Sequence, residues 1–246
     1  MMNNYNRINA HARDARVVFE PEEHIYIVDG DCRCDSVTTV ISDFFSKFDA
    51  DYWAQRKATP QCSAEMLKAQ WKAKAEAAAA LGTQMHARIE AHYLGKEPDE
   101  EALADGAFRH FLNFTKNHRL TPFRTEWSVF SKQHRIAGTL DFLGHDGGVF
   151  EIYDWKRSTK VVDAWGHPIL ANYGKFGFGP LCAVPDTSFH HYALQQSMYR
   201  YLLSLNYGIE VAACHLGVFH PDMADYHVVD VPYLLDEVKA ILDTRR

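Results

Sequence analysis

The feature that most constrains the fold is a block of three strand-like segments in the middle of the chain. Residues 125–131, 135–143 and 149–155 are rich in β-branched and aromatic side chains, which favour strands. The last two are separated by residues 145–148, whose His-Asp-Gly-Gly sequence is typical of a hairpin connection. A hairpin pairs consecutive strands antiparallel, so the block predicts the centre of a β-sheet.

The segments on either side of this block predict helices, short strands and one long loop. Residues 16–40 alternate short β-like runs with turns, which indicates a small meander, and Ser36 is placed to cap a helix over 37–45. Residues 64–94 lack proline and are rich in Ala, Lys, Glu and Gln, which predicts a long helix that Gly82 can break. We also expect helices at 100–117, at 192–206 and at the C-terminus, a hairpin between 213 and 231, and a loop at 162–189 that is rich in glycine and aromatic residues, a kind that is usually functional or mobile.

The length of the chain limits how these elements can be organised. At 246 residues it is at the upper size of one domain. The elements predict an α/β fold with a mixed central β-sheet flanked by helices, an N-terminal β-meander and helical embellishments. We expect one domain over residues 1–246, in which residues 1–120 supply the meander and helices. Residues 121–246, with the helix at 64–94, form the core of that domain.

Charge is unevenly distributed along the chain. The formal net charge is −6, which taken alone disfavours a nucleic-acid partner, because phosphate binding is largely electrostatic. Residues 116–160, however, hold 8 basic and 5 acidic side chains. The acidity of the whole chain therefore does not exclude a polynucleotide ligand at the central block.

Cysteine usage and hydropathy indicate the compartment. The five cysteines are scattered and include no Cys-x-x-Cys pair, so we expect reduced thiols rather than disulfides or a zinc or iron–sulfur site. No run approaches the roughly 18 apolar residues of a membrane helix, and the first residues are polar. We expect a cytoplasmic or other reducing compartment, no secretion and no membrane partner. No Walker A motif is present, which argues against a built-in ATP motor.

An acid two residues before a lysine occurs twice, and the context differs. Glu237 and Lys239 lie in a predicted helix, where positions i and i+2 do not share a face. Asp154 and Lys156 lie at the end of a predicted strand, where alternation points both side chains the same way. A carboxylate and an ammonium that leave a buried row together are costly unless paired or used. The second pair is therefore a candidate site.

Asp141 and His86 are the groups that could join Asp154 and Lys156. Asp141 lies on the preceding strand, and the hairpin turn could bring it alongside Asp154. Two carboxylates with a lysine suit metal-dependent phosphodiester hydrolysis, because the acids hold hard cations and the cations lower the pKa of bound water. His86 shares a helical stripe with Gly82 and Glu90 and could point at the acids. The structural alternative is a buried Asp–Lys pair with an unrelated histidine.

A second helical group could support the lysine or contact a phosphate. Gln195 and Tyr199 are spaced i, i+4, and Tyr192 lies one turn earlier, on a face distinct from the apolar stripe. An amide and a phenol there could bind a phosphate or hold Lys156 in place. An ordinary amphipathic helix with polar residues at its boundary would give the same pattern.

The order of these elements resembles a known superfamily. The segments Gly82-Thr83-x-x-His86, Gly138-Thr139-x-Asp141, Asp154-Trp155-Lys156 and Gln195-x-x-x-Tyr199 resemble the PD-(D/E)XK nucleases, specifically the RecB-like exonuclease branch. Within that branch the mitochondrial genome maintenance exonuclease and related phage or large-virus nucleases look most similar. The resemblance covers roughly residues 80–205 and implies a restriction-endonuclease-like core and roles in DNA repair or recombination.

The resemblance also implies roles for individual residues. His86, Asp141 and Asp154 would be metal ligands, with the backbone carbonyl of Trp155 completing the coordination, and Lys156 would be the catalytic lysine. Glu126 is a weaker candidate beside the site. The residues implied in nucleic-acid binding are Thr83, Arg157, Gln195 and Tyr199. The cofactor would be Mg²⁺ or Mn²⁺, and no iron–sulfur cluster is expected, because the cysteines of the cluster-containing relatives are missing.

The resulting prediction is a metal-dependent DNA nuclease, an exonuclease acting on single-stranded or frayed ends, with a replication or recombination protein as a further partner. Two alternatives stay open. One is an RNA endonuclease of the cap-snatching kind, which also joins a histidine to acids and a lysine. The other is a catalytically inactive nucleic-acid-binding module.

Overall fold

The structure is a computed structural model that describes residues 4–245. Within that range, eight strands form one sheet in the order β1-β2-β3-β5-β6-β7-β8, and β4 pairs with β5 outside this path. The pairs β3–β5 and β6–β7 are parallel and the other pairs are antiparallel. The strands are β1 (Val17–Glu20), β2 (Ile25–Val28), β3 (Cys32–Ser36), β4 (Pro122–Ser131), β5 (Ile136–Asp146), β6 (Val149–Lys156), β7 (Val211–Val218) and β8 (His227–Asp230).

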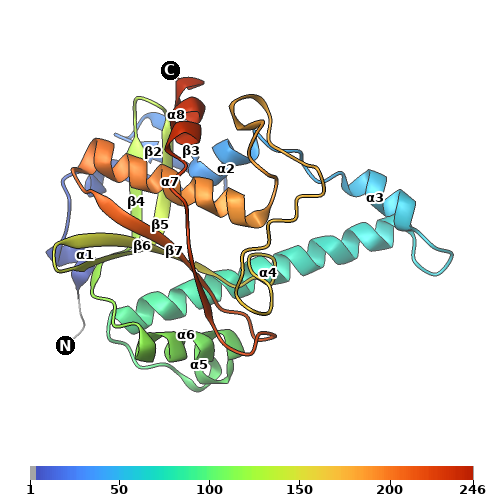
Figure 1. Ribbon diagram of the computed structural model, residues 1–246, viewed down its shortest axis with the longest axis horizontal. Coiled ribbons are helices and arrows are strands. Elements are labelled where there is room, and N and C mark those ends of the chain that lie inside the picture. Colours follow the sequence, from blue (N-terminus) through green and yellow to red (C-terminus); the bar gives the residue numbers. More distant parts are fainter. Residues whose placement is uncertain (1–3, 246) are drawn as a thin grey trace.

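Helices cover both faces of the sheet (Figure 1). One face packs against α2, α7 and α8 in a core that includes Ile41, Leu194 and Ile241. The other face packs against α4 and α6 in a core that includes Met85, Phe111 and Trp155. The helices are α1 (Tyr5–Ile8), α2 (Val37–Ser42), α3 (Ala50–Lys57), α4 (Ala64–Tyr93), α5 (Glu100–Ala104), α6 (Gly106–Asn117), α7 (Ser188–Tyr207) and α8 (Leu235–Asp243), with 3-10 turns η1 (Asp14–Arg16) and η2 (Gly179–Leu181).

The predicted α/β class, with a mixed central sheet flanked by helices, is confirmed, and the arrangement is compatible with a restriction-endonuclease-like core. The predicted meander is present, but its third strand β3 also pairs with β5 and so joins the central sheet. Both faces of the sheet are buried by helices, which explains why β6 is apolar on both sides along much of its length.

The helix α7 begins at Ser188 rather than at residue 192, and three further helix boundaries differ from the sequence-based expectation. The helix α4 continues through Gly82, because good helix formers on both sides outweigh the cost of about 1 kcal/mol for one glycine. The predicted helix at 100–117 is divided at Asp105, whose extended backbone ends α5 and whose carboxylate accepts a hydrogen bond from Ala107 N at the start of α6. Ser36 caps α2 as predicted, but that helix ends at Ser42.

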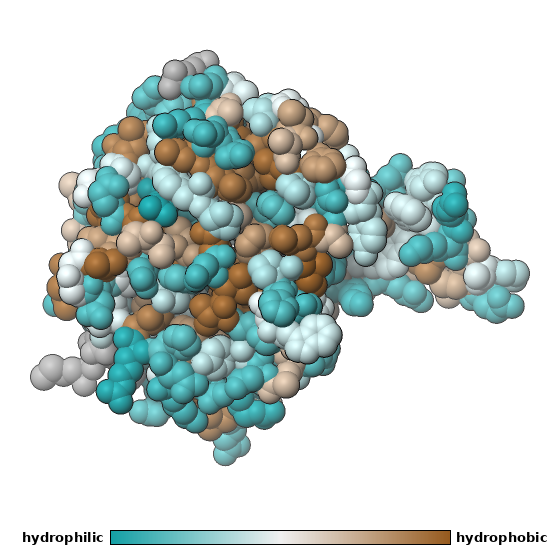
Figure 2. All heavy atoms as spheres, in the orientation of Figure 1, coloured by the Kyte–Doolittle hydropathy of each residue, from teal (hydrophilic) through white to brown (hydrophobic). Residues whose placement is uncertain are grey.

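The helix α3 and the first half of α4 project from the body of the molecule (Figure 1). The projecting part of α4 is exposed on nearly all sides, and Figure 2 shows that the surface of this projection is mostly hydrophilic. No helix within residues 4–245 has both the length and the apolar character needed to cross a membrane.

Candidate metal centre

One edge of β5 has a gap in its strand pairing, and the candidate residues gather there. On this edge β3 pairs with the first two residues of β5, Ile136 and Ala137, and β6 pairs only from Phe142 onward. Residues 138–141 therefore have no strand partner on this edge, while β4 runs along the other edge. A gap inside a sheet leaves room for side chains where a backbone ladder would otherwise stand.

The hairpin of β5 and β6 brings the two predicted acids to this gap. Phe142 pairs with Tyr153, and the next residues outward are Asp141 and Asp154. There the ladder stops, and the Asp141 carboxylate accepts a hydrogen bond of 2.8 Å from the backbone N–H of Trp155. The Asp141 side chain thus replaces the missing backbone acceptor. Asp141 and Asp154 lie on adjacent strands, as the hairpin turn in the sequence predicted.

Glu126 on β4 is a member of the group that sequence reasoning placed only beside the site. The residues on either side of Glu126 pair with those on either side of Asp141, so the two acids are opposite each other in the β4–β5 hairpin. Glu126 has φ +46° in the middle of a strand. A left-handed backbone at a residue other than glycine costs of order 1–3 kcal/mol and is often found at functional sites. The hairpin register was the sequence signal that could have identified it.

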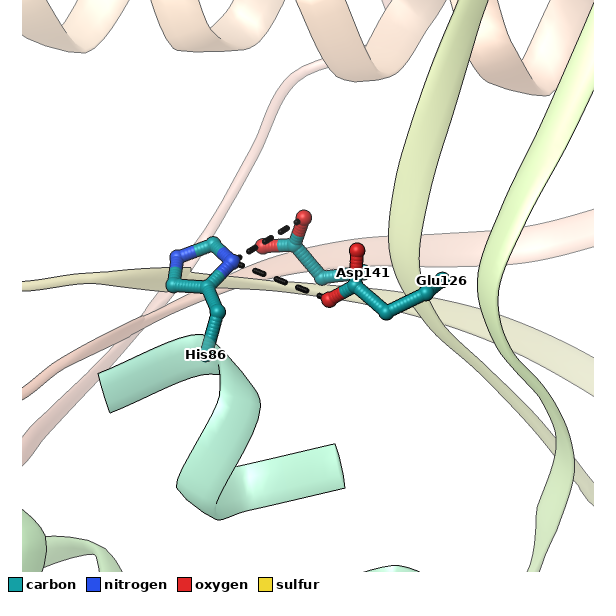
Figure 3. Close-up of side chains that lie close together, drawn as sticks. All are labelled: His86, Glu126 and Asp141. Carbon is teal, nitrogen blue, oxygen red and sulfur yellow. Dashed lines mark ion pairs between the residues drawn. The ribbon is translucent and has the colours of Figure 1, made fainter. Parts of the chain in front are cut away.

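His86 reaches the acids from α4 (Figure 3). Its Nδ1 lies 3.6 Å from Asp141 Oδ1 and 3.8 Å from Glu126 Oε1. Its Nε2 donates to the backbone carbonyl of Trp155 at 2.8 Å, since the carbonyl can only accept. This bond fixes the ring with Nδ1 facing the carboxylates, which is how proteins orient a metal-binding histidine. The ligand atoms of His86, Glu126 and Asp141 all lie within 4.8 Å of one another.

Lys156 and Asp154 form a buried pair next to this group. The Lys156 ammonium lies 2.5 Å from Asp154 Oδ2 and 4.5 Å from the centre of the Tyr192 ring. Asp154 Oδ1 is buried and has no hydrogen-bond partner within residues 4–245. A buried oxygen that lacks a donor is costly, and a bound cation would satisfy it. Asp154 contributes no atom to the three-residue group, so its predicted role as a ligand stays a prediction.

Burial and charge shift the ionisation of these groups. Burial raises the pKa of Asp154 to about 6, against the opposing effect of Lys156. Burial also raises the pKa of Asp141, which the positive charges of His86 and Lys156 oppose. Burial lowers the pKa of His86, but the carboxylates of Asp141 and Glu126 outweigh it and raise the value to about 9. A divalent cation bound beside these carboxyl groups would stabilise their charged forms and so lower their raised pKa values.

The pair Gln195 and Tyr199 lies at the same gap but is buried. Gln195 Nε2 donates to the Tyr199 hydroxyl at 3.3 Å, and Tyr199 is only 3% exposed. The Tyr199 ring occupies the space left by Gly138, since a Cβ there would lie 2.7 Å from the ring. Such burial leaves little surface for a direct contact with a nucleic acid. Of the two predicted roles, support of the site is the one that this position favours, and the contact with Lys156 is made by Tyr192.

The other predicted residues lie at the edge of the site. The Trp155 carbonyl accepts the His86 hydrogen bond, so its clearest role is to orient that ring. Thr83 is exposed on α4, one turn before His86. Arg157 follows the lysine directly, and its guanidinium lies 3.8 Å from Asp105. Direct contact of either side chain with a polynucleotide stays a prediction.

The fold and this site define an α/β protein with a candidate cation site where the pairing of its central sheet is interrupted. No protein-family profile and no curated protein matches the chain. Among solved structures, a protein described as "Crystal structure of SSO0001" is similar, with 18% sequence identity over 65% of this chain and 68% of that chain and a TM-score of 0.30. A similarity of this size carries no argument about function.

Proposed function

We propose that this protein is a divalent-metal-dependent nuclease that hydrolyses phosphodiester bonds in DNA, as an exonuclease at single-stranded or frayed ends. The observation that supports this most is the convergence of His86, Glu126, Asp141, Asp154 and Lys156 at one gap in the sheet. Structural ion pairs seldom bury two carboxylates, here Asp141 and Asp154, beside one lysine. A site that binds both a cation and a phosphate needs carboxylates to hold the cation and a positive group such as a lysine to face the phosphate.

The donor set fits a hard divalent cation. Carboxylate oxygens of Asp141 and Glu126, with the unpartnered oxygen of Asp154, are ligands that Mg²⁺ prefers, and His86 makes the site acceptable to Mn²⁺. When bound, such a cation supplies an acidified water and charge stabilisation for hydrolysis.

The remaining residues would position the reacting groups. Trp155 holds His86 by its carbonyl and Asp141 by its N–H, so one peptide segment fixes two ligands. Lys156 is fixed between Asp154 and the face of Tyr192. From that place its ammonium can orient a water or stabilise the negative charge that develops on phosphate oxygens.

The direct test is hydrolysis by the purified chain. End-labelled single-stranded DNA, duplex DNA and RNA are incubated with the protein in EDTA, Mg²⁺ or Mn²⁺. We expect DNA degradation that requires the metal, and a loss of at least about 100-fold for Asp154→Asn or Lys156→Ala. The matched control is the double variant Glu237→Gln/Lys239→Ala, which removes the same acid-x-lysine spacing from the surface of α8.

Three results would each contradict part of the proposal. If Asp154→Asn or Lys156→Ala leaves hydrolysis intact, the site assignment is wrong. If RNA is degraded and DNA is not, the substrate is that of a cap-snatching-like endonuclease. If the wild-type chain hydrolyses neither and calorimetric titration shows no divalent binding, the protein is a non-catalytic module.

A further inference from the structure

Two adjoining hollows lie beside the end of β6, outside the group of His86, Glu126 and Asp141. The first encloses about 420 Å³ between α4 and residues 157–160, with Trp71 and Lys74 on one side and Arg157 and Lys160 on the other. The second encloses about 400 Å³ beneath the loop that follows, where Tyr173 and Lys175 face the start of α7. Both hollows are lined by Thr159 and Lys160, so they form one groove with Lys160 at its middle. We call it the β6 groove.

The charge of the β6 groove is opposite to that of the whole chain. Its basic side chains are Lys74, Arg157, Lys160 and Lys175, in a protein of formal net charge −6. The three lysines are exposed and form no ion pair within residues 4–245. Unpaired lysines that line one groove attract a polyanion.

The acids near the groove already have partners. The one acid in the lining, Asp186, is bonded to His191 at 2.9 Å. Asp105 lies beside Arg157 but also pairs with Arg88 at 3.0 Å. By contrast, the hollow at the other end of β6 is lined by Asp146 and Glu151 together with Arg119, His145 and uncharged residues. A basic surface is thus a property of this end of the strand.

Each half of the groove also contains an aromatic ring. Trp71 lies on α4 and is half-buried, with its ring against Phe48. Tyr173 is 93% exposed and stands in a turn where it and Gly174 both have positive φ. A tyrosine that is fully presented to solvent from a constrained turn contributes nothing to a core. Rings beside unpaired cations are what unstacked nucleobases bind, at about 1–3 kcal/mol per base.

The β6 groove begins at the residue that follows Lys156 in the chain. Arg157 follows Lys156, and Lys160 lies three residues further along the same segment. Ser188, the first residue of the 20-residue helix α7, lines the far half, so the positive end of that helix dipole borders the groove. A polyanion in the groove would have one end beside Arg157, the residue that follows Lys156.

We infer that the β6 groove binds a single-stranded polynucleotide, with phosphates on Lys160, Lys74 and Lys175 and bases stacked on Tyr173 and Trp71. The strand is single because stacking on these rings requires unpaired bases. This inference rests on the proposed function in one respect, the direction in which the bound polynucleotide runs. Under that function the polynucleotide enters the candidate metal centre past Arg157. The binding itself requires no hydrolysis.

The test is binding of fluorescent oligonucleotides to the full chain in EDTA, measured by anisotropy, so that hydrolysis plays no part. We expect Lys160→Glu to weaken binding of single-stranded DNA at least tenfold and Tyr173→Ala to weaken it about tenfold. Lys239→Glu, an equal charge change on an exposed residue of α8, is the matched control and should leave affinity within twofold. Duplex DNA and single-stranded RNA of equal length separate the classes of polynucleotide.

Salt dependence provides a readout that a purely structural defect would not change. The logarithm of the binding constant should fall linearly with the logarithm of salt concentration, and Lys160→Gln should reduce that slope by about 0.7, the value for one phosphate contact on a single strand. Tyr173→Ala should leave the slope unchanged, because it removes stacking and no charge. Because Tyr173 is almost fully exposed, its removal will not unfold the protein.

The outcomes separate this inference from the proposed function. Tight binding that Lys160→Glu and Tyr173→Ala each weaken about tenfold or more, in a protein that hydrolyses nothing with any metal, supports the groove and overturns the nuclease. Hydrolysis that depends on Asp154, with binding unaffected by both groove variants, overturns the groove alone. Equal affinity for duplex and single strand, with no loss in Tyr173→Ala, also overturns it.

Discussion

The two ends of the β5–β6 hairpin use the same strands in opposite ways. At the closed end the ladder is complete from Phe142–Tyr153 to Asp146–Val149, and Gly147 and Gly148 make the turn with φ +55° and +90°. At the open end the ladder stops and the Asp141 side chain takes over as acceptor for Trp155 N–H. Backbone pairing satisfies its own polar atoms, whereas side-chain pairing at the open end leaves Asp154 Oδ1 without a donor among residues 4–245.

The strand β6 carries one carboxylate near each end of the hairpin, and the two carboxylates differ in exposure and in the charges around them. The Glu151 side chain near the closed end is 38% exposed and accepts a hydrogen bond from the Tyr153 hydroxyl. The Asp154 side chain at the open end is 2% exposed and faces the charges of Lys156 and Asp141. The closed end stabilises the sheet, and the open end concentrates charge at a cost that a bound cation would offset.

The largest effect should come from removing a charge at the open end. Asp141→Asn keeps the size of the side chain and still accepts from Trp155 N–H, but it removes one negative ligand. We expect loss of metal-dependent hydrolysis of at least about 100-fold and loss of Mn²⁺ binding by calorimetry. Glu151→Gln, the same change near the closed end, should alter either quantity by less than about twofold. If both variants behave alike, the two ends do not differ in function.

The second effect is a dependence of metal affinity on pH. Without metal, His86 keeps a proton up to about pH 9, because Asp141 and Glu126 outweigh the effect of burial on its pKa. A metal on Nδ1 must displace that proton, so affinity rises with pH, by up to about tenfold per unit, until about pH 9. The pKa of Asp154, about 6, weakens binding further in more acid solution.

The same shift affects the stability of the metal-free protein. The pKa of His86 rises from 6.5 to about 9 on folding. Its contribution to stability is therefore complete below pH 6.5 and is lost as the pH rises through about 9.

Calorimetric Mn²⁺ titrations in buffers of different ionisation heat count the proton that metal binding displaces from His86. The variant His86→Gln should remove this proton release, whereas His167→Gln, on the exposed loop, should not. Affinity that is constant with pH would contradict this account.

The closed end was predictable from sequence and most of the open end was not. The glycines at 147 and 148 mark the turn, and alternation along β6 places Asp154 and Lys156 on one side, because both signals are local. The gap arises because β3, from residues 32–36, pairs with only two residues of β5. Parallel pairing between segments about 100 residues apart leaves no local pattern in the sequence.

The same division between local sequence signals and long-range contacts applies to the individual residues of the site. The stripe of α4 that carries His86 was visible as a helical repeat, but its bond to Trp155, 69 positions away, fixes the ring and could not be predicted. Glu126 joins the site through a left-handed backbone that no propensity favours for glutamate. The helical spacing groups Tyr192 with Gln195 and Tyr199, but only the packing of α7 shows that its ring lies on Lys156.

The smallest expected effect concerns the packing of the Tyr199 ring against Gly138, which fills the gap at the open end of the hairpin. Gly138→Ala would place a Cβ 2.7 Å from the buried Tyr199 ring, so we expect a loss of about 1–3 kcal/mol in the free energy of unfolding. A Cβ at Gly147, in the turn, meets no atom of the described residues 4–245 within 4 Å, so Gly147→Ala has only the φ of +55° to overcome, which costs about 1 kcal/mol.

Urea denaturation measures both variants, and the double variant Gly138→Ala/Tyr199→Ala shows whether the ring is the cause. Residues in direct contact are non-additive by about 0.5–3 kcal/mol, so removing the ring should recover part of the Gly138→Ala loss. Gly147→Ala/Tyr199→Ala should be additive, because the turn glycine touches no side chain within 4 Å. If Gly138→Ala is no more destabilising than Gly147→Ala, Tyr199 does not fill the gap, and the open end is held apart by the strand pairing alone.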